Sequence, residues 1–112
     1  MNEPPFKFPG PASIDVSIIV VSFNTKTILL NCLESVYAMT QGISFEVFVV
    51  DNGSRDGSPE AVAQSFPQAV LIKNSHNRGL SVAFNQGIRK SRGRYIVLLN
   101  SDTVLIENCF LK

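Results

Sequence analysis

Cysteine is scarce in this chain of 112 residues, which contains only Cys32 and Cys109. The two lie far apart, and neither belongs to a CxxC motif or lies near a cluster of histidines. This pattern suggests neither a zinc site nor a disulfide-stabilised scaffold. We therefore expect a protein of a reducing, cytoplasmic compartment.

Long apolar runs and a strong net charge are also missing. No apolar stretch approaches the ~20 residues of a membrane-spanning helix. A formal net charge of +1 gives no strong field for attracting nucleic acid, so no nucleic-acid partner is expected. The patterns GxGxxG and GxxxxGKS/T do not occur, which argues against a nicotinamide enzyme and a P-loop nucleotide hydrolase.

The composition is that of an ordinary globular protein, with 45% hydrophobic and 17% charged residues. The length suits a single domain. Residues 1–15 contain four of the six prolines and are predicted to form a flexible leader. The folded domain is predicted over residues 16–112.

β-Branched apolar runs alternate with amphipathic segments along the domain. The runs predict strands over residues 16–22, 45–51, 69–73 and 95–99, and the amphipathic segments predict helices over residues 25–39, 58–66 and 80–92. The first run, VSIIVVS, is apolar on both faces, as in a strand covered on both sides. This alternation predicts a Rossmann-like, three-layer α/β fold, in which a parallel sheet has helices on both faces.

Residues near the predicted helix ends carry boundary signals. Asn24 or Thr25 could cap the first helix. Ser58 could cap the second, with Pro59 in its first turn. Gly93 is the expected stop of the third.

Asp51 and Asp102 each come directly after an apolar strand. A carboxylate there is costly unless a ligand, a cation or local hydrogen bonds satisfy it. Each aspartate alone is better explained as a turn residue that accepts hydrogen bonds from backbone amides. Both lie at the carboxyl edge of the predicted sheet, where ligands bind in such folds, and this favours function.

Other polar features are less specific. His76, the single histidine, lies in a predicted loop, where a hydrogen-bonded or solvated residue is more common than a general base. The basic run RKSRGR fits a solvated helix end, where positive charge suits the helix dipole. The alternative interpretation, which ranks below this one, is that the run contacts phosphate.

Three stretches, VSIIVVSFN, VFVVDNGSRDGS and NRGLSVAFNQGIRKSRGRYIVLLNSD, occur in the order found in family 2 glycosyltransferases. The chain from Val16 to Lys112 closely resembles the nucleotide-binding half of that family. The resemblance implies a partial A-type glycosyltransferase fold. It also implies inverting transfer of a sugar from a nucleotide diphosphate donor, with Mg²⁺ or Mn²⁺ holding the diphosphate.

The resemblance implies donor-binding roles for residues after the first two strands. Ser22 and Asn24 would line the nucleoside pocket. Asp51 would accept a hydrogen bond from a pyrimidine base, and Ser54 would lie in the adjoining loop. The donor implied is therefore a UDP-sugar or a dTDP-sugar.

Further donor-binding roles follow for residues later in the chain. Gly79 would allow close approach of the backbone, and Asn85 would help to shape the donor pocket. Asp102 would be the metal ligand of the family's D-x-D signature, with Asn100 in place of its first aspartate. Asn100, together with Asn52 in place of a second aspartate, resembles the rhamnosyltransferase-like branch, which uses dTDP-rhamnose.

Family members continue well past the point that corresponds to Lys112, into an acceptor-binding half that carries the general base. The resemblance therefore implies a catalytic base beyond Lys112 and an inactive chain when tested alone. It implies a saccharide or lipid-linked acceptor, cell-surface polysaccharide synthesis and a site at the cytoplasmic membrane face. A sheet truncated in this way is expected to self-associate through its open edge.

Two other functions remain open. A non-catalytic nucleotide-binding or assembly module would keep this fold without turnover. A nucleotidyltransferase also uses a parallel α/β sheet and a cation, but usually carries a glycine-rich, basic loop after the first strand. The segment VSFNTKT does not resemble such a loop.

Overall fold

The structure is a computed structural model that describes residues 14–105. Its elements are β1 (Val16–Ser22), α1 (Lys26–Met39), β2 (Phe45–Asp51), α2 (Ser58–Ser65), β3 (Val70–Lys73), α3 (Leu80–Lys90) and β4 (Tyr95–Asn100). The predicted alternation of strands and helices is confirmed. The largest difference is at the end of α3, which stops two residues earlier than predicted.

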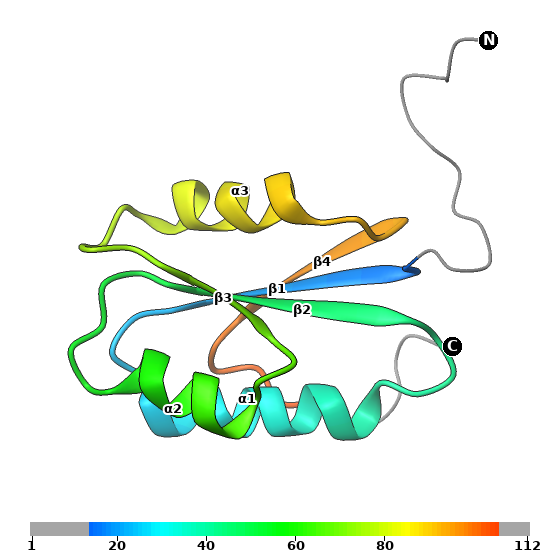
Figure 1. Ribbon diagram of the computed structural model, residues 1–112, viewed down its shortest axis with the longest axis horizontal. Helices are drawn as coiled ribbons and strands as arrows, with labels where there is room; N and C mark the ends of the chain where they lie inside the picture. Colours follow the sequence, from blue (N-terminus) through cyan, green and yellow to red (C-terminus); the bar gives the residue numbers. More distant parts are fainter. Residues whose placement is uncertain (1–13, 106–112) are drawn as a thin grey trace, which may run out of the picture.

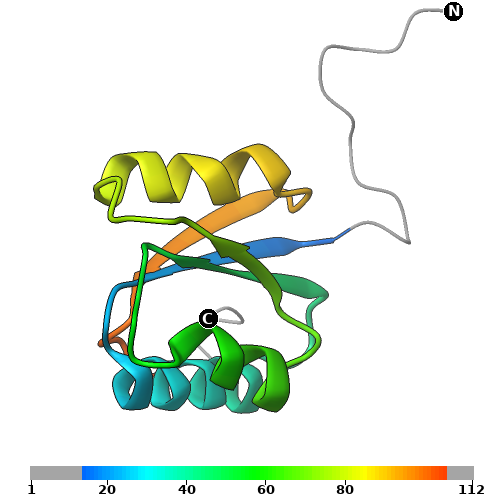
Figure 2. The same ribbon diagram turned by 60° about the vertical axis from the view of Figure 1, so that its left-hand side comes forward.

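The four strands form one parallel sheet in the order β3-β2-β1-β4. Helices α1 and α2 cover one face and α3 covers the other, which gives three layers (Figures 1 and 2). All four strands point the same way, so their carboxyl ends meet at one edge. The predicted three-layer α/β fold is confirmed.

The core lies on both sides of β1, all seven residues of which are buried. Val16, Ile18 and Val20 pack in one cluster with residues of α1, α2 and β2. Ile19 and Val21 pack in a second cluster that includes Ala83 of α3. The two-sided burial explains why this run has apolar residues at successive positions.

Strand β4 lies at an edge of the sheet and is less covered. Val97 and Leu99 pack against the α1 side, whereas Ile96 and Leu98 are 43% and 47% exposed. Because side chains alternate along a strand, these two point to the face that carries α3. Self-association through this edge stays a prediction.

The start of α2 differs from the prediction, whereas the start of α1 falls at one of the two residues predicted. The N-cap of α2 is Gly57, with a φ of 83°, so the prediction of a Ser58 cap was wrong. The carboxylate of Asp56 instead accepts hydrogen bonds from the backbone N–H of Ser58 and of Lys26, both at 3.0 Å. Thr25 is the N-cap residue of α1 but makes no side-chain capping bond. One carboxylate thus serves the first turns of two helices, and Pro59 lies in the first turn of α2 as predicted.

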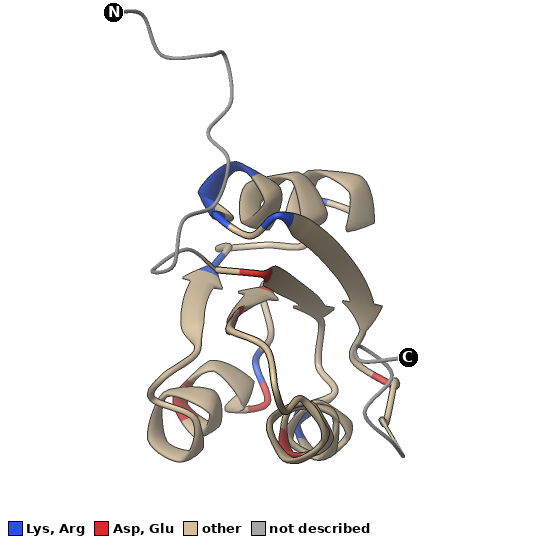
Figure 3. Ribbon diagram, turned by 90° about the vertical axis from the view of Figure 1, so that its right-hand side faces the viewer, with Lys and Arg blue, Asp and Glu red and all other residues tan. Residues whose placement is uncertain are grey.

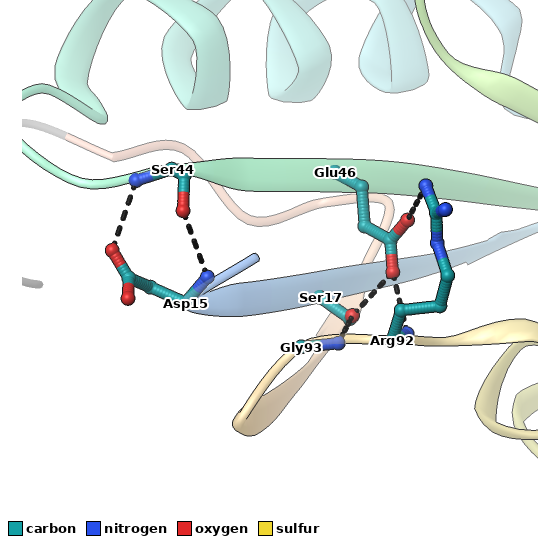
Figure 4. Close-up of polar contacts among 6 residues, drawn as sticks. All are labelled: Asp15, Ser17, Ser44, Glu46, Arg92 and Gly93. Atoms are coloured by element: carbon teal, nitrogen blue, oxygen red, sulfur yellow. Dashed lines mark hydrogen bonds and ion pairs between the residues drawn. The ribbon is translucent and has the colours of Figure 1, made fainter. Parts of the chain in front are cut away.

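A polar cluster closes the opposite, amino-terminal edge of the sheet (Figure 4). Glu46 Oε2 accepts from Ser17 Oγ at 2.6 Å and from the Arg92 backbone N–H at 2.7 Å. Ser17 Oγ in turn accepts from the Gly93 N–H at 2.7 Å. Gly93 does not stop α3, which ends at Lys90 with Ser91 as its C-cap. A Cβ on Gly93 would fall 2.5 Å from Ser17 N, so close packing, rather than a helix stop, requires glycine here.

The predicted leader falls mostly on residues 1–13, which lie outside the described residues. Within the described part, Asp15 is already held by hydrogen bonds to Ser44, since its backbone N–H donates to Ser44 Oγ at 2.9 Å and its Oδ2 accepts from the Ser44 N–H at 3.1 Å (Figure 4). The backbone N–H of Arg94 donates to Ile14 O at 3.1 Å. Contacts with the sheet therefore begin two residues before β1. Between residues 14 and 105, no helix has the length and apolar character needed to cross a membrane.

Candidate functional site

Polar residues gather where the parallel strands end. Ser22 and Asp51 are register partners at the ends of β1 and β2. Asn100 ends β4 and lies opposite Val21. These strand ends and the loops that follow them occupy one side of the molecule (Figure 1). The sequence prediction that these polar residues share one edge is confirmed.

Asp51 is only half satisfied within the protein. Its side chain is 2% exposed, and its Oδ2 accepts from the backbone N–H of Gly53 at 3.2 Å and of Ser54 at 2.8 Å. Its Oδ1 is buried without a hydrogen-bond partner in the described part of the chain. The interpretation of Asp51 as a turn residue that accepts hydrogen bonds from backbone amides accounts for Oδ2 but not for Oδ1. A buried acceptor without a partner is costly, so Oδ1 calls for a donor from outside residues 14–105.

Asn24 and Ser54 link the loops after β1 and β2. The Asn24 backbone N–H donates to Ser54 Oγ at 2.7 Å, and Asn24 Oδ1 accepts from the Arg55 N–H at 2.8 Å. Asn24 adopts a left-handed φ of 51°, which asparagine tolerates better than most residues. These bonds explain why the Asn24 side chain does not cap α1. The structure thus brings Asn24 and Ser54 together beside Asp51.

A cavity of about 230 Å³ lies among the loops after β1, β2 and β3. It is lined by Phe23, Asn24, Gly53, Arg55, Ser75, His76 and Asn77. The Phe23 side chain is 44% exposed and offers a ring to a planar ligand. Sequence reasoning missed Phe23 and Arg55 as site residues. The signal that could have identified them is their place in the sequence, directly next to Asn24 and Ser54.

His76 contributes to the cavity from the loop after β3. It is exposed, and its Nδ1 lies 3.1 Å from Ser75 Oγ. The structure therefore agrees with a hydrogen-bonded loop histidine. Its position in the cavity wall makes it a candidate for contact with a ligand.

Ser22 is buried in a short chain of hydroxyl groups. Its Oγ lies 2.9 Å from Thr25 Oγ1, which lies 3.0 Å from Ser101 Oγ. This chain joins the end of β1, the start of α1 and the turn after β4. Ser22 therefore helps to hold the edge of the site in place.

Asn100 and Asp102 flank that turn after β4. The backbone oxygen of Asn100 accepts from the Thr103 N–H at 3.0 Å, and the side chains of Asn100 and Asp102 are exposed. Asp102 lies near enough to Cys32 that its charge adds to the effect of burial, which raises the pKa of that thiol to about 11. Both residues therefore lie at the predicted edge, with side chains open to a ligand.

No group of three or more His, Cys, Asp or Glu residues that could hold a metal occurs among residues 14–105. Asp102 alone cannot coordinate a cation fully. Mg²⁺ and Mn²⁺ are commonly held by one or two carboxylates together with the phosphates of a ligand and waters. The residues present fit a divalent cation only in that mode, in which a diphosphate supplies the remaining oxygens.

Gly79 and Asn85 lie farther along the chain. Gly79 has φ 88° and ψ 163°, and apart from its chain neighbours no atom of the described residues lies within 4 Å of where a Cβ would be. Open space therefore faces its backbone. Asn85 is exposed on α3, two residues after the buried Ala83, which directs it away from the sheet. Their roles in donor binding stay predictions.

The basic run at residues 89–94 lies at the other end of the molecule. Arg89 and Lys90 lie in the last turn of α3, where their positive charge suits the helix dipole, as predicted. Figure 3 shows positive residues at this end of α3 and before β4. The guanidinium of Arg94 lies 5.8 Å from the centre of the Tyr95 ring. The run precedes β4, whereas the candidate site follows the strand ends.

Comparison with known proteins identifies the family. The sequence model described as "Glycosyl transferase family 2" matches residues 17–112. This chain belongs to glycosyl transferase family 2. Among similar members, "Succinoglycan biosynthesis protein ExoO" of Rhizobium meliloti is 39% identical over 89 residues, which are 79% of this chain and 25% of that protein. The chain thus spans about a quarter of the length of this relative.

Solved structures of other proteins share the fold. The mannosyltransferase PcManGT from Pyrobaculum calidifontis, solved in complex with GDP-Man and Mn²⁺, has a TM-score of 0.77 at 28% identity, covering 94% of this chain and 34% of that one. S. aureus TarS 1-349 in complex with UDP-GlcNAc has a TM-score of 0.75 at 24% identity, covering 88% and 29% of the two chains. The predicted A-type glycosyltransferase fold is confirmed for the part that this family 2 chain contains.

Proposed function

We propose that this family 2 chain is the donor-binding part of an inverting glycosyltransferase that uses a UDP-sugar or a dTDP-sugar. The observation that carries the proposal is the buried Oδ1 of Asp51, which has no partner among residues 14–105 and lies two positions before Gly53 in the wall of the 230 Å³ cavity. Uracil and thymine both present an N–H group between two carbonyls. Asp51 Oδ1 is an acceptor for that N–H, while Oδ2 stays bonded to Gly53 and Ser54.

The surrounding residues support a nucleoside in this position. The exposed ring of Phe23 can stack on a planar base. Asn24 and Ser54 fix the two loops between which the base would lie. Ser22 anchors the strand end beside them through Thr25. These residues orient the donor, and Arg55 adds a positive group to the cavity wall.

Asp102, with Asn100 beside it, is the proposed site of a divalent cation shared with the diphosphate. A bound Mg²⁺ or Mn²⁺ would supply charge stabilisation to the departing diphosphate. The exposed Asp102 carboxylate would provide the protein ligand, and the open space at Gly79 would admit the phosphate or sugar. The Mn²⁺ of the PcManGT complex supports this assignment by analogy.

The donor sugar is proposed to be rhamnose or another hexose. Asn52 and Asn100, in place of two aspartates, are the features shared with the rhamnosyltransferase-like branch. The neighbouring structures were solved with GDP-Man and with UDP-GlcNAc, so the shared fold accommodates different bases. A comparison of UDP, dTDP and GDP binding therefore decides the base.

The parent reaction is proposed to be polysaccharide synthesis with a saccharide or lipid-linked acceptor at the cytoplasmic membrane face. The likeness to a succinoglycan biosynthesis protein supports this class. That relative is about four times as long as the matching segment, so we propose that its additional length corresponds to the half that supplies the acceptor site and the general base. This chain alone would then bind the donor without turnover.

Calorimetry tests the donor site directly. The chain is titrated with UDP, dTDP and GDP, with and without Mn²⁺, alongside Asp51→Asn, Asp102→Asn and the exposed α1 control Glu34→Gln. In Asp51→Asn, an amide N–H₂ can take the place of Oδ1 and face the base N–H donor-to-donor, so binding should weaken by roughly tenfold or more. Asp102→Asn should remove only the gain in affinity due to Mn²⁺.

Either of two outcomes would contradict the proposal. One is nucleotide binding that Asp51→Asn leaves unchanged. The other is a folded chain that binds none of the three nucleotides, which would favour a non-catalytic assembly module with this fold. Glu34→Gln should match the parent chain throughout.

A further inference from the structure

Asn52 follows Asp51 and uses every hydrogen-bonding position of its side chain. Its Nδ2 donates to Asn77 Oδ1 at 3.1 Å and to Gly79 O at 3.2 Å. Its Oδ1 accepts from Asn74 Nδ2 at 3.1 Å and from the Arg78 backbone N–H at 3.0 Å. The residue is only 3% exposed. A primary amide has two donor hydrogens and two acceptor lone pairs, so all four are occupied.

Two backbone groups determine which way this amide points. Gly79 O can only accept, and the Arg78 N–H can only donate, so the Asn52 nitrogen must face Gly79 and its oxygen must face Arg78. An aspartate of the same shape would keep both acceptor contacts. It would, however, place an anionic oxygen against Gly79 O and Asn77 Oδ1 without a proton to share. The site therefore requires an amide at position 52.

The four bonds all reach one segment, residues 74–79, which connects β3 to α3. Asn74 and Gln86 extend the network to α3 through a reciprocal pair of amide bonds, both at 2.8 Å. Gly79 O also accepts from the Ala83 N–H at 3.2 Å, the first bond of α3. Asn52 thus ties the end of β2 to the start of α3 across the site.

The same segment forms one wall of the cavity. Ser75, His76 and Asn77 line it, and Gly79 faces open space. The other two walls are joined to each other by Asn24 and Ser54. Asn52 provides most of the hydrogen bonds that join residues 74–79 to the loops after β1 and β2. It does not itself line the cavity.

We propose that Asn52 is a positioning residue that sets the 74–79 wall for donor binding, and that this role is why asparagine follows Asp51. The proposal rests on the nucleotide-binding function proposed above. It is distinct from the direct contacts assigned to Asp51 and Asp102, because Asn52 acts on the ligand only through residues 74–79.

The test compares the full chain with Asn52→Asp and with Asn31→Asp, which adds the same charge on the exposed surface of α1. At pH 7, UDP and dTDP should bind to Asn52→Asp roughly ten- to a hundredfold more weakly, since buried acceptors are left facing an anion. Amide hydrogen exchange at residues 77–79 should accelerate in the same variant. Asn31→Asp should match the parent chain in both measurements.

Acidification provides a readout that a general loss of stability would not give. Burial raises the pKa of an introduced carboxyl group, and its protonated form carries one O–H donor that can serve Gly79 O. The ratio of the Asn52→Asp dissociation constant to the parent value should therefore shrink between pH 7 and pH 5. A constant ratio over that range would contradict the proposed geometry.

A second variant covers the case in which Asn52→Asp does not fold. Gln86→Glu replaces the donor to Asn74 Oδ1 with a carboxylate oxygen, and Gln86 does not line the cavity. It should weaken nucleotide binding by a few fold through the same wall. Unchanged affinity in every folded variant would overturn the role of Asn52 and leave the proposed function intact. Absence of nucleotide binding by the parent chain would overturn both.

Discussion

Gly53 lies directly against the backbone of His76, so that a Cβ on Gly53 would fall 2.7 Å from the His76 Cα. This approach brings the loop after β2 onto the loop after β3. Gly53 also has a φ of 91°, which disfavours any residue with a side chain. The cavity that both residues line therefore depends on the absence of one methyl group.

Gly53→Ala should destabilise the chain more than Gly57→Ala. Both glycines have left-handed φ values, but the atom nearest to a Cβ on Gly57 is the flexible Lys26 Nζ at 3.7 Å. Gly57→Ala should therefore cost about 1 kcal/mol of backbone strain. Gly53→Ala should cost ~2–4 kcal/mol, because the backbone of residue 76 must also move. Urea unfolding measures the difference, and equal losses would contradict the close approach.

Glu46→Ala should be far more harmful than Arg92→Ala. Removal of the Glu46 carboxylate leaves Ser17 Oγ and the Arg92 backbone N–H without their acceptor (Figure 4), a loss of ~2–3 kcal/mol. Removal of the Arg92 guanidinium breaks only a 3.5 Å ion pair whose arginine is 76% exposed, worth less than about 1 kcal/mol. Comparable destabilisation of the two variants in urea would show that the ion pair, and not the carboxylate's acceptance from Ser17 and Arg92, provides the stability.

Asp56→Ala should reduce stability at neutral pH and lose its effect in acid. The hydrogen bond from Ser58 Oγ is the main cause that holds the pKa of Asp56 below its usual range, and the backbone N–H of Lys26 adds to it. A lowered pKa means that the stabilisation is complete above the ordinary aspartate value of about 3.9 and disappears as the pH falls through the folded-state value. Because the group is exposed, the effect should be about 1 kcal/mol or less.

Thermal unfolding of Asp56→Ala and the parent chain from pH 7 to pH 2 tests this linkage. The two melting curves should converge at the acid end. The exposed Glu34→Ala serves as the control, with no comparable convergence. A difference that persists undiminished at pH 2 would rule out the carboxylate as its source.

Cys32 should be nearly inert to thiol reagents in the folded chain. Burial, aided by the charge of Asp102, raises its pKa to about 11, and its side chain is 0% exposed. In a Cys109→Ser background at pH 8, disulfide-exchange reagents should react more than about a hundredfold slower than with a free thiol. Ala38→Cys, at an exposed position of α1, supplies the fast comparison in the same background. Rapid labelling of Cys32 without unfolding would contradict the packing of α1.

The element order could be predicted from sequence because its signals are local. The two-sided apolar run Val16–Ser22 required a strand covered on both faces, and α1 and α3 indeed lie on opposite faces of β1. The strand ends predicted the shared edge of Ser22 and Asp51, since parallel strands bring their carboxyl ends together. The resemblance to family 2 glycosyltransferases then predicted the A-type fold.

The errors concern the two expected helix-end residues, Gly93 and Ser58. Gly93 resembled a helix stop but is required by contact with Ser17, 76 residues away. Ser58 resembled a helix cap, whereas the carboxylate of Asp56 serves both α2 and, 30 residues away, α1. Local patterns identify which residue types suit a helix end. They do not identify competing partners elsewhere in the fold.

The sequence by itself determined the order of strands and helices, the parallel sheet and the edge at which Asp51, Asn100 and Asp102 lie. Only the tertiary structure decided that, among residues 14–105, Asp51 Oδ1 lacks a partner and Asn52 has four. The physical reason is that periodicity and turn chemistry act over a few residues. Satisfaction of a buried polar group depends instead on atoms that folding brings together, here 22 to 27 residues away from Asn52.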